Sequence, residues 1–179
     1  MRILTRESKD IKKEDVIRIY EDLLKKVVDG VRRCFGKNLV SVVLYGSLAR
    51  GEVKKDSDID LLIIFEDLPK ERLKRQDIFM KMEGDVDEEI KRIYEKWRCY
   101  PYISPILKTR EEAKILSPLY LDMVTDARIL YDKADFFKGI LEKLRMELDS
   151  LHAKRKRVGK KWYWDLKPDY RLGEEIRIE

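Results

Sequence analysis

Two apolar runs rich in β-branched residues constrain the fold of this chain more than any other feature. They are LVSVVLY, residues 39–45, and IDLLIIF, residues 59–65. Both have the composition of buried strands. The link between them is too short for the helical crossover that joins parallel strands, which takes about a dozen residues or more. We therefore expect an antiparallel pair, with two aspartates, Asp58 and Asp60, at the start of its second strand.

The rest of the sequence surrounds this pair with helical patterns and a weaker strand. Residues 12–35 carry apolar residues at three-and-four spacing and are followed by Gly36, which predicts an amphipathic helix and its end. The other expected elements are a helix from Pro69 to about Trp97, with a break at Gly84 left open, an edge strand over residues 100–107, short helices from Thr109 and from Ser117, a short strand at RILY, and a final helix from Asp135 to about Arg157. This order predicts an α+β fold, a small mixed β-sheet with helices packed on it, plus a C-terminal helix and tail.

Length and composition predict one globular unit. With 179 residues, 42% charged and 44% hydrophobic, the chain has room for one core beneath a surface dense in charges. We divide it into a main domain, residues 1–132, and a C-terminal amphipathic helix with a basic and aromatic tail, residues 133–179, packed on that domain. The scarcity of Asn and Gln, one of each, is typical of thermophiles. No apolar stretch reaches membrane-spanning length, so we expect a cytoplasmic protein.

The two aspartates are the first candidates for a functional site. Residues two apart in a strand point to the same face, so Asp58 and Asp60 are expected about 6.6 Å apart along one face. Two ionised carboxylates at that distance repel by ~2.5 kcal/mol at an effective dielectric of about 20. A positive charge is therefore expected between them. It is either a basic side chain, from Lys54, Lys55 or Arg50, or a divalent cation that prefers oxygen ligands.

A glycine-serine turn precedes the aspartates and suits an anion. Gly46 permits a backbone conformation and a close approach that a side chain would prevent, and Ser47 offers its hydroxyl and its amide. An ordinary tight turn is the alternative for this pair taken alone. Arg50 either binds phosphate or pairs with Glu52. With phosphates on the turn and metal on the aspartates, the residues predict metal-assisted phosphoryl transfer.

These residues also carry a family resemblance. Gly46-Ser47, ten intervening residues and then Asp58-Ile59-Asp60 resemble the signature of the polymerase-β-like nucleotidyltransferase superfamily. GSLARGE and SDIDLLI are especially similar to its small prokaryotic members, the minimal nucleotidyltransferases. The resemblance is tight over the motif, and the order of elements extends it loosely to residues 12–110.

The resemblance implies a site, a reaction and a partner. It implies that Asp58 and Asp60 are catalytic and ligate Mg²⁺ or Mn²⁺, and that Gly46 and Ser47 hold the phosphates of a nucleoside triphosphate, with ATP the expected one. Arg50 would add charge to the nucleotide site. The implied reaction moves a nucleoside monophosphate to a hydroxyl of a protein, an RNA end or a small molecule. Minimal members often act as the antitoxin half of a pair beside a helical HEPN-type protein partner, to which they add AMP.

The sequence departs from the family in its third strand, where a further carboxylate normally faces the metal ions. The expected strand contains no acid and has Ser104 near that place, so Glu111, Glu112, Asp122 and Asp126 are the candidate substitutes. Without one, the alternative is a catalytically weak or inactive nucleotide-binding or antitoxin-like module.

The C-terminal tail offers one more interpretation. HAKRKRVGKKWYWDLK, residues 152–167, interleaves basic and aromatic residues as nucleic-acid-binding surfaces do. A nucleic-acid-binding domain that uses this tail is therefore the third functional hypothesis. The structural alternative is a basic helix end followed by aromatic residues that fold back on the domain.

Overall fold

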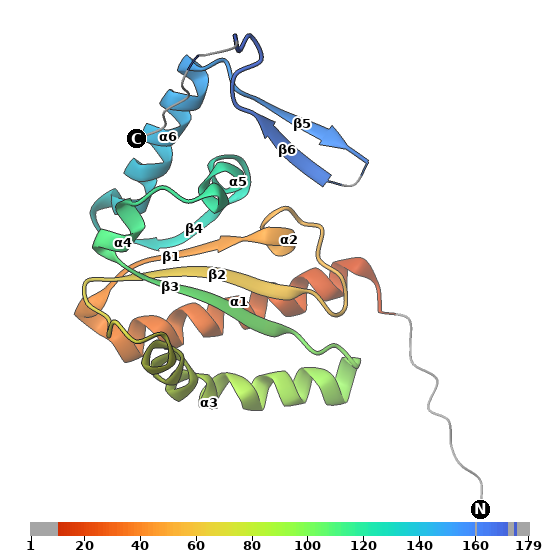
Figure 1. Cartoon of the computed structure of the whole chain (residues 1–179). Helices are drawn as coiled ribbons and strands as arrows, with labels where there is room; N and C mark the ends of the chain where they lie inside the picture. Colours follow the sequence, from red (N-terminus) through yellow and green to blue (C-terminus); the bar gives the residue numbers. More distant parts are fainter. Residues whose placement is uncertain (1–10, 160, 172–173, 175–179) are drawn as a thin grey trace, which may run out of the picture.

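The computed structural model describes residues 11–159, 161–171 and 174, which form a four-stranded mixed sheet between two layers of helices (Figure 1). The strands are β1 (Leu39–Tyr45), β2 (Asp58–Phe65), β3 (Tyr102–Thr109) and β4 (Arg128–Asp132), in the order β3-β2-β1-β4. β1 is antiparallel to both β2 and β4, while β3 runs parallel to β2. The α+β class and the antiparallel β1–β2 pair are confirmed, as are the edge position of β3 and the short strand β4.

Two long helices cover one face of the sheet. α1 (Lys13–Phe35) buries Tyr20 and Val27 against β2, with acids in its first turn, basic residues in its last, and Gly36 at φ +49° ending it as predicted. α3 (Arg72–Trp97) starts later than predicted and continues through Gly84 as one helix. Its axis bends, because Figure 1 shows its early turns end-on and its later turns lengthwise. A 3₁₀ turn, η1 (Gly36–Asn38), leads from α1 into β1.

Three helices cover the other face. They are α4 (Arg110–Lys114), α5 (Pro118–Asp126) and α6 (Phe136–Ser150), which pack on Val43, Leu62 and Ile64 of the sheet. The predicted capping box is present at Thr109, and Ser117 caps α5. A short helix, α2 (Gly46–Ala49), follows β1, and a 3₁₀ turn, η2 (Lys133–Asp135), precedes α6.

The predicted helix to about Arg157 is wrong after Ser150. The basic run forms β5 (Lys154–Val158), which pairs with β6 (Lys161–Asp165) in an antiparallel hairpin (Figure 1). Trp164 packs on the core of the α4–α6 face and lies opposite Arg155, whose side chain is held by contacts outside the hairpin. Tertiary packing therefore overrides the helical pattern here. Trp164 thus packs back on the domain, whereas Trp162 and Tyr163 are exposed.

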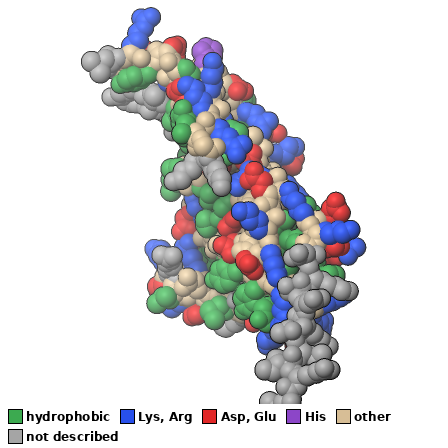
Figure 2. Space-filling model, turned by 90° about the vertical axis from the view of Figure 1, so that its right-hand side faces the viewer, with side chains coloured by type: hydrophobic (Ala, Val, Ile, Leu, Met, Phe, Trp, Pro, Cys, Tyr) green, Lys and Arg blue, Asp and Glu red, His purple; other side chains and the backbone are tan. Residues whose placement is uncertain are grey.

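The division after residue 132 falls at the end of β4 and stays a prediction. α6 lies beyond that point, yet its Phe137, Leu144 and Leu148 are buried in the core of the sheet. Basic and acidic side chains are intermixed over the face in Figure 2, so the formal net charge of +5 does not gather into one broad patch on that face. In the part of the chain that the structure describes, no helix is both long enough and apolar enough to cross a membrane.

Candidate nucleotide and metal site

The two predicted aspartates lie at the start of β2 on the face that α4–α6 partly cover. Ile59 and Leu61 point into the α1–α3 core, so Asp58 and Asp60 project to the opposite side. Asp58 is exposed and Asp60 is half-buried. Within residues 11–159, 161–171 and 174, no ion pair joins either carboxylate to a lysine or arginine. The structural alternative, in which Lys54, Lys55 or Arg50 neutralises the pair directly, is not what the structure contains.

Gly46 touches Asp60, which brings the turn and the carboxylate into one site. Gly46 has φ +74°, and a Cβ built on it would lie 2.1 Å from Oδ2 and 3.0 Å from Cγ of Asp60. Only glycine fits between these groups without a shift. Ser47 follows in the first turn of α2, and among the described residues its hydroxyl has no hydrogen-bond partner. Glycine at 46 is therefore required by the carboxylate as well as by the turn.

The electrostatics of Asp60 indicate a missing positive charge. Burial, followed by the charge of Asp58, raises the pKa of the Asp60 carboxyl, and Arg50 only partly opposes this rise. Tyr45 is paired with Asp60 across the β1–β2 ladder, and burial together with the Asp60 charge raises its pKa to about 12. Two hard carboxylates on one face, one of them short of a counter-charge, are a donor set that fits Mg²⁺ or Mn²⁺.

The loop before Asp58 is fixed by a residue that the motif did not reveal. Tyr20 of α1 is fully buried, and its hydroxyl donates to the carbonyl oxygens of Lys55 at 3.0 Å and Ser57 at 2.8 Å. Ser57 Oγ accepts from the amide of Lys54 at 2.8 Å, so this serine orients the loop. In the sequence, Tyr20 is recognisable only as one of the apolar positions of the first helix.

Arg50 lies beside the turn between two carboxylates. Its Nε donates to Glu52 Oε2 at 2.9 Å, and its Nη1 is 3.8 Å from Oδ2 of Asp126 at the end of α5. The predicted alternative of a pair with Glu52 is thus present, and the contact with Asp126 was not foreseen. A guanidinium in this position still contributes positive charge near Asp60.

None of the four candidate substitutes supplies a third ligand in this structure. Ser104 pairs with Asp60 in the parallel β2–β3 register, so the position beside Asp60 on β3 holds a hydroxyl. The register continues to Thr109 opposite Phe65, and α4 begins only after that point. Glu111 and Glu112 therefore lie beyond the far end of β2, roughly 23 Å along the strand from Asp58.

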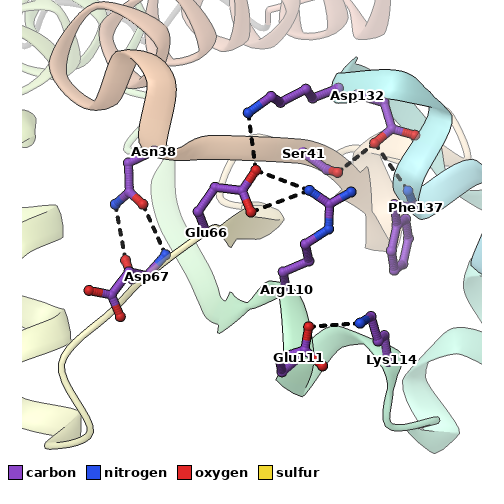
Figure 3. A network of polar contacts seen from close by, with 10 residues as sticks. Asn38, Ser41, Glu66, Asp67, Arg110, Glu111, Lys114, Asp132 and Phe137 are labelled. Atoms are coloured by element: carbon purple, nitrogen blue, oxygen red, sulfur yellow. Dashed lines mark hydrogen bonds and ion pairs between the residues drawn. The ribbon is translucent and has the colours of Figure 1, made fainter.

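The engagements of these acids agree with their positions. Figure 3 shows Glu111 paired with Lys114. This pair lies near Glu66, the residue that follows the end of β2. Glu112 is held by Arg75, which lowers its pKa to about 2. Asp122 and Asp126 both contact Arg155 of β5. Among the described residues, no group of three or more His, Cys, Asp or Glu side chains is arranged to hold a metal ion.

A groove borders the site along the outer edge of β3. Its volume is about 790 Å³, and it runs between α3 and the start of α4. Tyr102 and Ser104, which pair with Asp58 and Asp60, form part of its lining. Asp58, Asp60 and Ser47 are not among its lining residues, so the groove lies beside the site and is not the site itself.

The family is shown by a direct match. The model of a family described as "Nucleotidyltransferase domain" matches residues 24–131, which include the turn, both aspartates and all four sheet strands apart from the last residue of β4. The chain belongs to this nucleotidyltransferase family. The recognition made from the motif is confirmed.

Several proteins are similar to this nucleotidyltransferase-domain chain. A Methanocaldococcus jannaschii protein named "Putative protein adenylyltransferase MJ1305" is 34% identical over 131 residues, which cover 70% of this chain and 83% of the relative. The structure of spectinomycin adenyltransferase AAD(9) from Enterococcus faecialis with ATP and spectinomycin has a TM-score of 0.48 at 16% identity, covering 74% of this chain and 66% of that one. A toxin-antitoxin structure, MntA-HpeT, has a TM-score of 0.43 at 18% identity, covering 72% and 88%.

Proposed function

We propose that this protein transfers AMP from ATP to a hydroxyl group of a protein, with a divalent metal ion held by Asp58 and Asp60. The family supports nucleotidyl transfer, and the name of the M. jannaschii relative supports adenylyl transfer to protein. The observation that carries the proposal is the contact between Gly46 and Asp60, because it joins a turn suited to phosphates to a carboxylate whose charge is disfavoured by burial and offset only in part by Arg50.

The metal would be held by the carboxylates of Asp58 and Asp60. When bound, Mg²⁺ supplies positive charge to the phosphate oxygens at the reacting centre and lowers the pKa of an oxygen nucleophile. The protein has hard oxygen donors for it on one face of β2, and burial of Asp60 favours a cation over an unpaired carboxylate. Tyr20 keeps the preceding loop in place, so packing holds the start of β2, where both carboxylates lie.

The turn would bind the triphosphate. Gly46 lets the turn lie directly against the Asp60 carboxylate, and Ser47 offers a hydroxyl that has no hydrogen-bond partner among the described residues. Arg50 adds a cation that is already beside the turn, where it offsets part of the negative charge of the bound nucleotide. These three residues position and neutralise the nucleotide.

The test is label transfer from ATP. The protein is incubated with Mg²⁺, ATP labelled at the α-phosphate and an extract, alongside Asp58→Asn and Asp60→Asn variants that keep side-chain size. We expect label in macromolecules from the unmodified protein only, and we expect protease, not ribonuclease, to release it. Label that survives in both variants would contradict the assignment of the carboxylates, and label sensitive to ribonuclease would contradict a protein acceptor.

A nucleotide-binding module with weak or no transfer is the second candidate. It is favoured by Ser104, because the β3 position beside Asp60 lacks the carboxylate that the resemblance implies. This candidate predicts ATP binding that depends on Asp58 and Asp60, with no label transfer to any acceptor. A helical HEPN-type partner suits either candidate and stays a prediction.

Nucleic-acid binding by the tail also stays a prediction. Trp164 packs on the core and the Trp162 ring carries the guanidinium groups of Arg155 and Arg157, but Trp162 and Tyr163 remain 43% and 46% exposed. Binding of single-stranded RNA to the protein, with and without Arg157→Gln and Tyr163→Ala, measures what remains available. No affinity for RNA would reject this hypothesis.

A further inference from the structure

A chain of ion pairs links the C-terminal hairpin to the candidate nucleotide turn. Arg155 of β5 donates two hydrogen bonds to Asp126, from Nη1 to Oδ1 at 2.8 Å and from Nη2 to Oδ2 at 2.7 Å. The same Oδ2 lies 3.8 Å from Nη1 of Arg50. Asp126 therefore stands between two guanidinium groups, one from the hairpin and one from the segment that follows α2.

The two carboxylates that contact Arg50 differ in their exposure to solvent. The side chain of Asp126 is 13% exposed and that of Arg155 is 14% exposed, whereas Glu52 is 59% exposed. Solvent and salt weaken the Glu52 contact more than the Asp126 contact, because screening acts mainly on exposed charges. Arg50 thus has a hydrogen bond of 2.9 Å to an exposed carboxylate, Glu52, and a longer contact of 3.8 Å with a largely buried carboxylate, Asp126, which solvent screens less.

The placement of Asp126 and Arg155 is poor for stability alone. Asp126 is the last residue of α5, where the negative end of the helix dipole disfavours an anion. Arg155 Nε is buried without a hydrogen-bond partner within the described part of the chain, and such a donor costs free energy. Buried ion pairs often give no net stabilisation over apolar side chains. A role beyond holding the fold together would account for both features.

The hairpin holds Arg155 in place from a second direction. The Arg155 guanidinium lies 4.7 Å from the centroid of the Trp162 ring on β6, and its Nη2 is 3.5 Å from Asp122 of α5. Trp164 anchors the hairpin in the core of the α4–α6 face. In Figure 1 the hairpin extends over α5 and α2. It also lies outside residues 24–131, so the family match alone does not account for it.

We infer that Asp126 and Arg155 are positioning residues for Arg50, and that the C-terminal hairpin is therefore part of the nucleotide site. Arg155 fixes the Asp126 carboxylate, and this carboxylate keeps the Arg50 guanidinium beside the turn before ATP arrives. The inference rests on the proposed function, because it assigns Arg50 a contact with the triphosphate. It goes further by naming the residues outside the motif that prepare this contact.

The test is a mutant cycle on ATP binding. Affinity for a non-hydrolysable ATP analogue with Mg²⁺ is measured by calorimetry for the unmodified protein, Arg50→Ala, Asp126→Asn/Arg155→Gln, and the triple variant. The double variant neutralises both partners, so it leaves no buried charge uncompensated. Asp126→Asn alone is a second variant that keeps side-chain size. Asp165→Asn is the matched control, because the ion pair that the structure gives Asp165 is with Lys156 of the same hairpin and lies outside the Arg50–Asp126–Arg155 chain. Melting temperatures are measured for all.

The expected result is a loss of affinity that depends on Arg50. The double variant and Asp126→Asn should bind about fivefold to tenfold more weakly, as for one partly shielded ion pair. The triple variant should bind as Arg50→Ala does, while Asp165→Asn binds normally. The double substitution should lower the melting temperature by the same amount with Arg50 present and with Arg50→Ala. This shared decrease measures the contribution of the Asp126–Arg155 pair to the fold, separate from its effect on ATP binding.

Three results would overturn the inference. The double variant and Asp126→Asn could both bind ATP as tightly as the unmodified protein. The loss could instead be the same in the Arg50→Ala background, which would mean that the pair acts through the fold and not through Arg50. If the unmodified protein does not bind ATP at all, the proposed function fails and this inference fails with it.

Discussion

Gly46→Ala is the sharpest test of the site, because the structure gives it a matched control. Gly46 and Gly51 both have positive φ, +74° and +68°. A left-handed alanine costs ~1–2 kcal/mol, so either substitution carries this backbone penalty. At Gly51 nothing lies within 4 Å of the new methyl group, whereas at Gly46 it meets Asp60 Oδ2 at 2.1 Å, Cγ at 3.0 Å and Cβ at 3.2 Å.

The contact with Asp60 decides the difference in size. Rotation of the carboxylate relieves the contact with Oδ2, but a methyl group 3.2 Å from Cβ of Asp60 also requires a shift of strand or turn. Overpacking of this kind adds ~1–3 kcal/mol. We therefore expect Gly51→Ala to lower the free energy of unfolding by about 1–2 kcal/mol and Gly46→Ala by about 2–5 kcal/mol.

Urea unfolding and calorimetric titration with a non-hydrolysable ATP analogue and Mg²⁺ measure the two consequences. Gly46→Ala should abolish detectable ATP binding because it displaces the Asp60 carboxylate, while Gly51→Ala should leave the dissociation constant within about twofold. In an Asp60→Ala background the excess cost of Gly46→Ala should shrink, since Oδ2 and Cγ are gone and only the contact with Cβ at 3.2 Å remains. Equal effects of the two glycine substitutions on stability and on ATP binding would refute the reasoning.

Three further substitutions test other parts of the structure. Ser104→Asp places a third carboxylate beside Asp60, so the free energy of unfolding should fall by ~2 kcal/mol without metal and recover with Mg²⁺; a melting temperature as insensitive to Mg²⁺ as that of the unmodified protein would contradict this. Tyr20→Phe removes the hydroxyl group that donates to the carbonyl oxygens of Lys55 and Ser57. The free energy of unfolding should therefore fall by about 1–2 kcal/mol, and ATP binding should weaken although no site carboxylate is changed. Unchanged urea unfolding together with an unchanged ATP titration would argue against this role of Tyr20. Glu112 has its pKa lowered to about 2 by its arginine partner, so its stabilising contribution is present above pH ~4.5 and is lost as the pH falls toward 2. The difference in free energy of unfolding between the unmodified protein and Glu112→Gln should therefore shrink from about 1 kcal/mol at pH 6 to near zero at pH 2. The value at pH 6 is small because the Glu112 carboxylate is 41% exposed. A difference in urea unfolding that does not depend on pH would be the contrary result.

The elements predicted well were those whose signal is local. β1 and β2 are short β-branched runs bounded by turn residues, and the intervening link allowed only an antiparallel return. The first helix was equally clear, because its apolar residues recur at helical spacing up to Gly36. The glycine-serine turn and the aspartates were visible for the same reason, since their spacing in the chain fixes their spacing in the site.

The C-terminal segment could not be predicted in this way. The basic run of residues 154–157 suits a helix end as well as a strand. The contact that holds it in the strand conformation involves Asp126, which lies 29 residues away from Arg155 in the sequence. The parallel register of β3 was equally hidden, because it is fixed by contacts with β2 across the long helix α3. That register excludes Glu111 and Glu112 as ligands and leaves Ser104 beside Asp60.

The sequence by itself determined the antiparallel strand pair, the turn and the two carboxylates on one face, because each depends on residues close together in the chain. Only the tertiary structure decided what surrounds them: Tyr20 beneath the loop, the missing carboxylate on β3, and Arg50 held between Glu52 and Asp126. The reason is physical. Periodicity and backbone preference act over a few residues, whereas the charge balance and burial of a site are set by side chains that meet only when the layers pack.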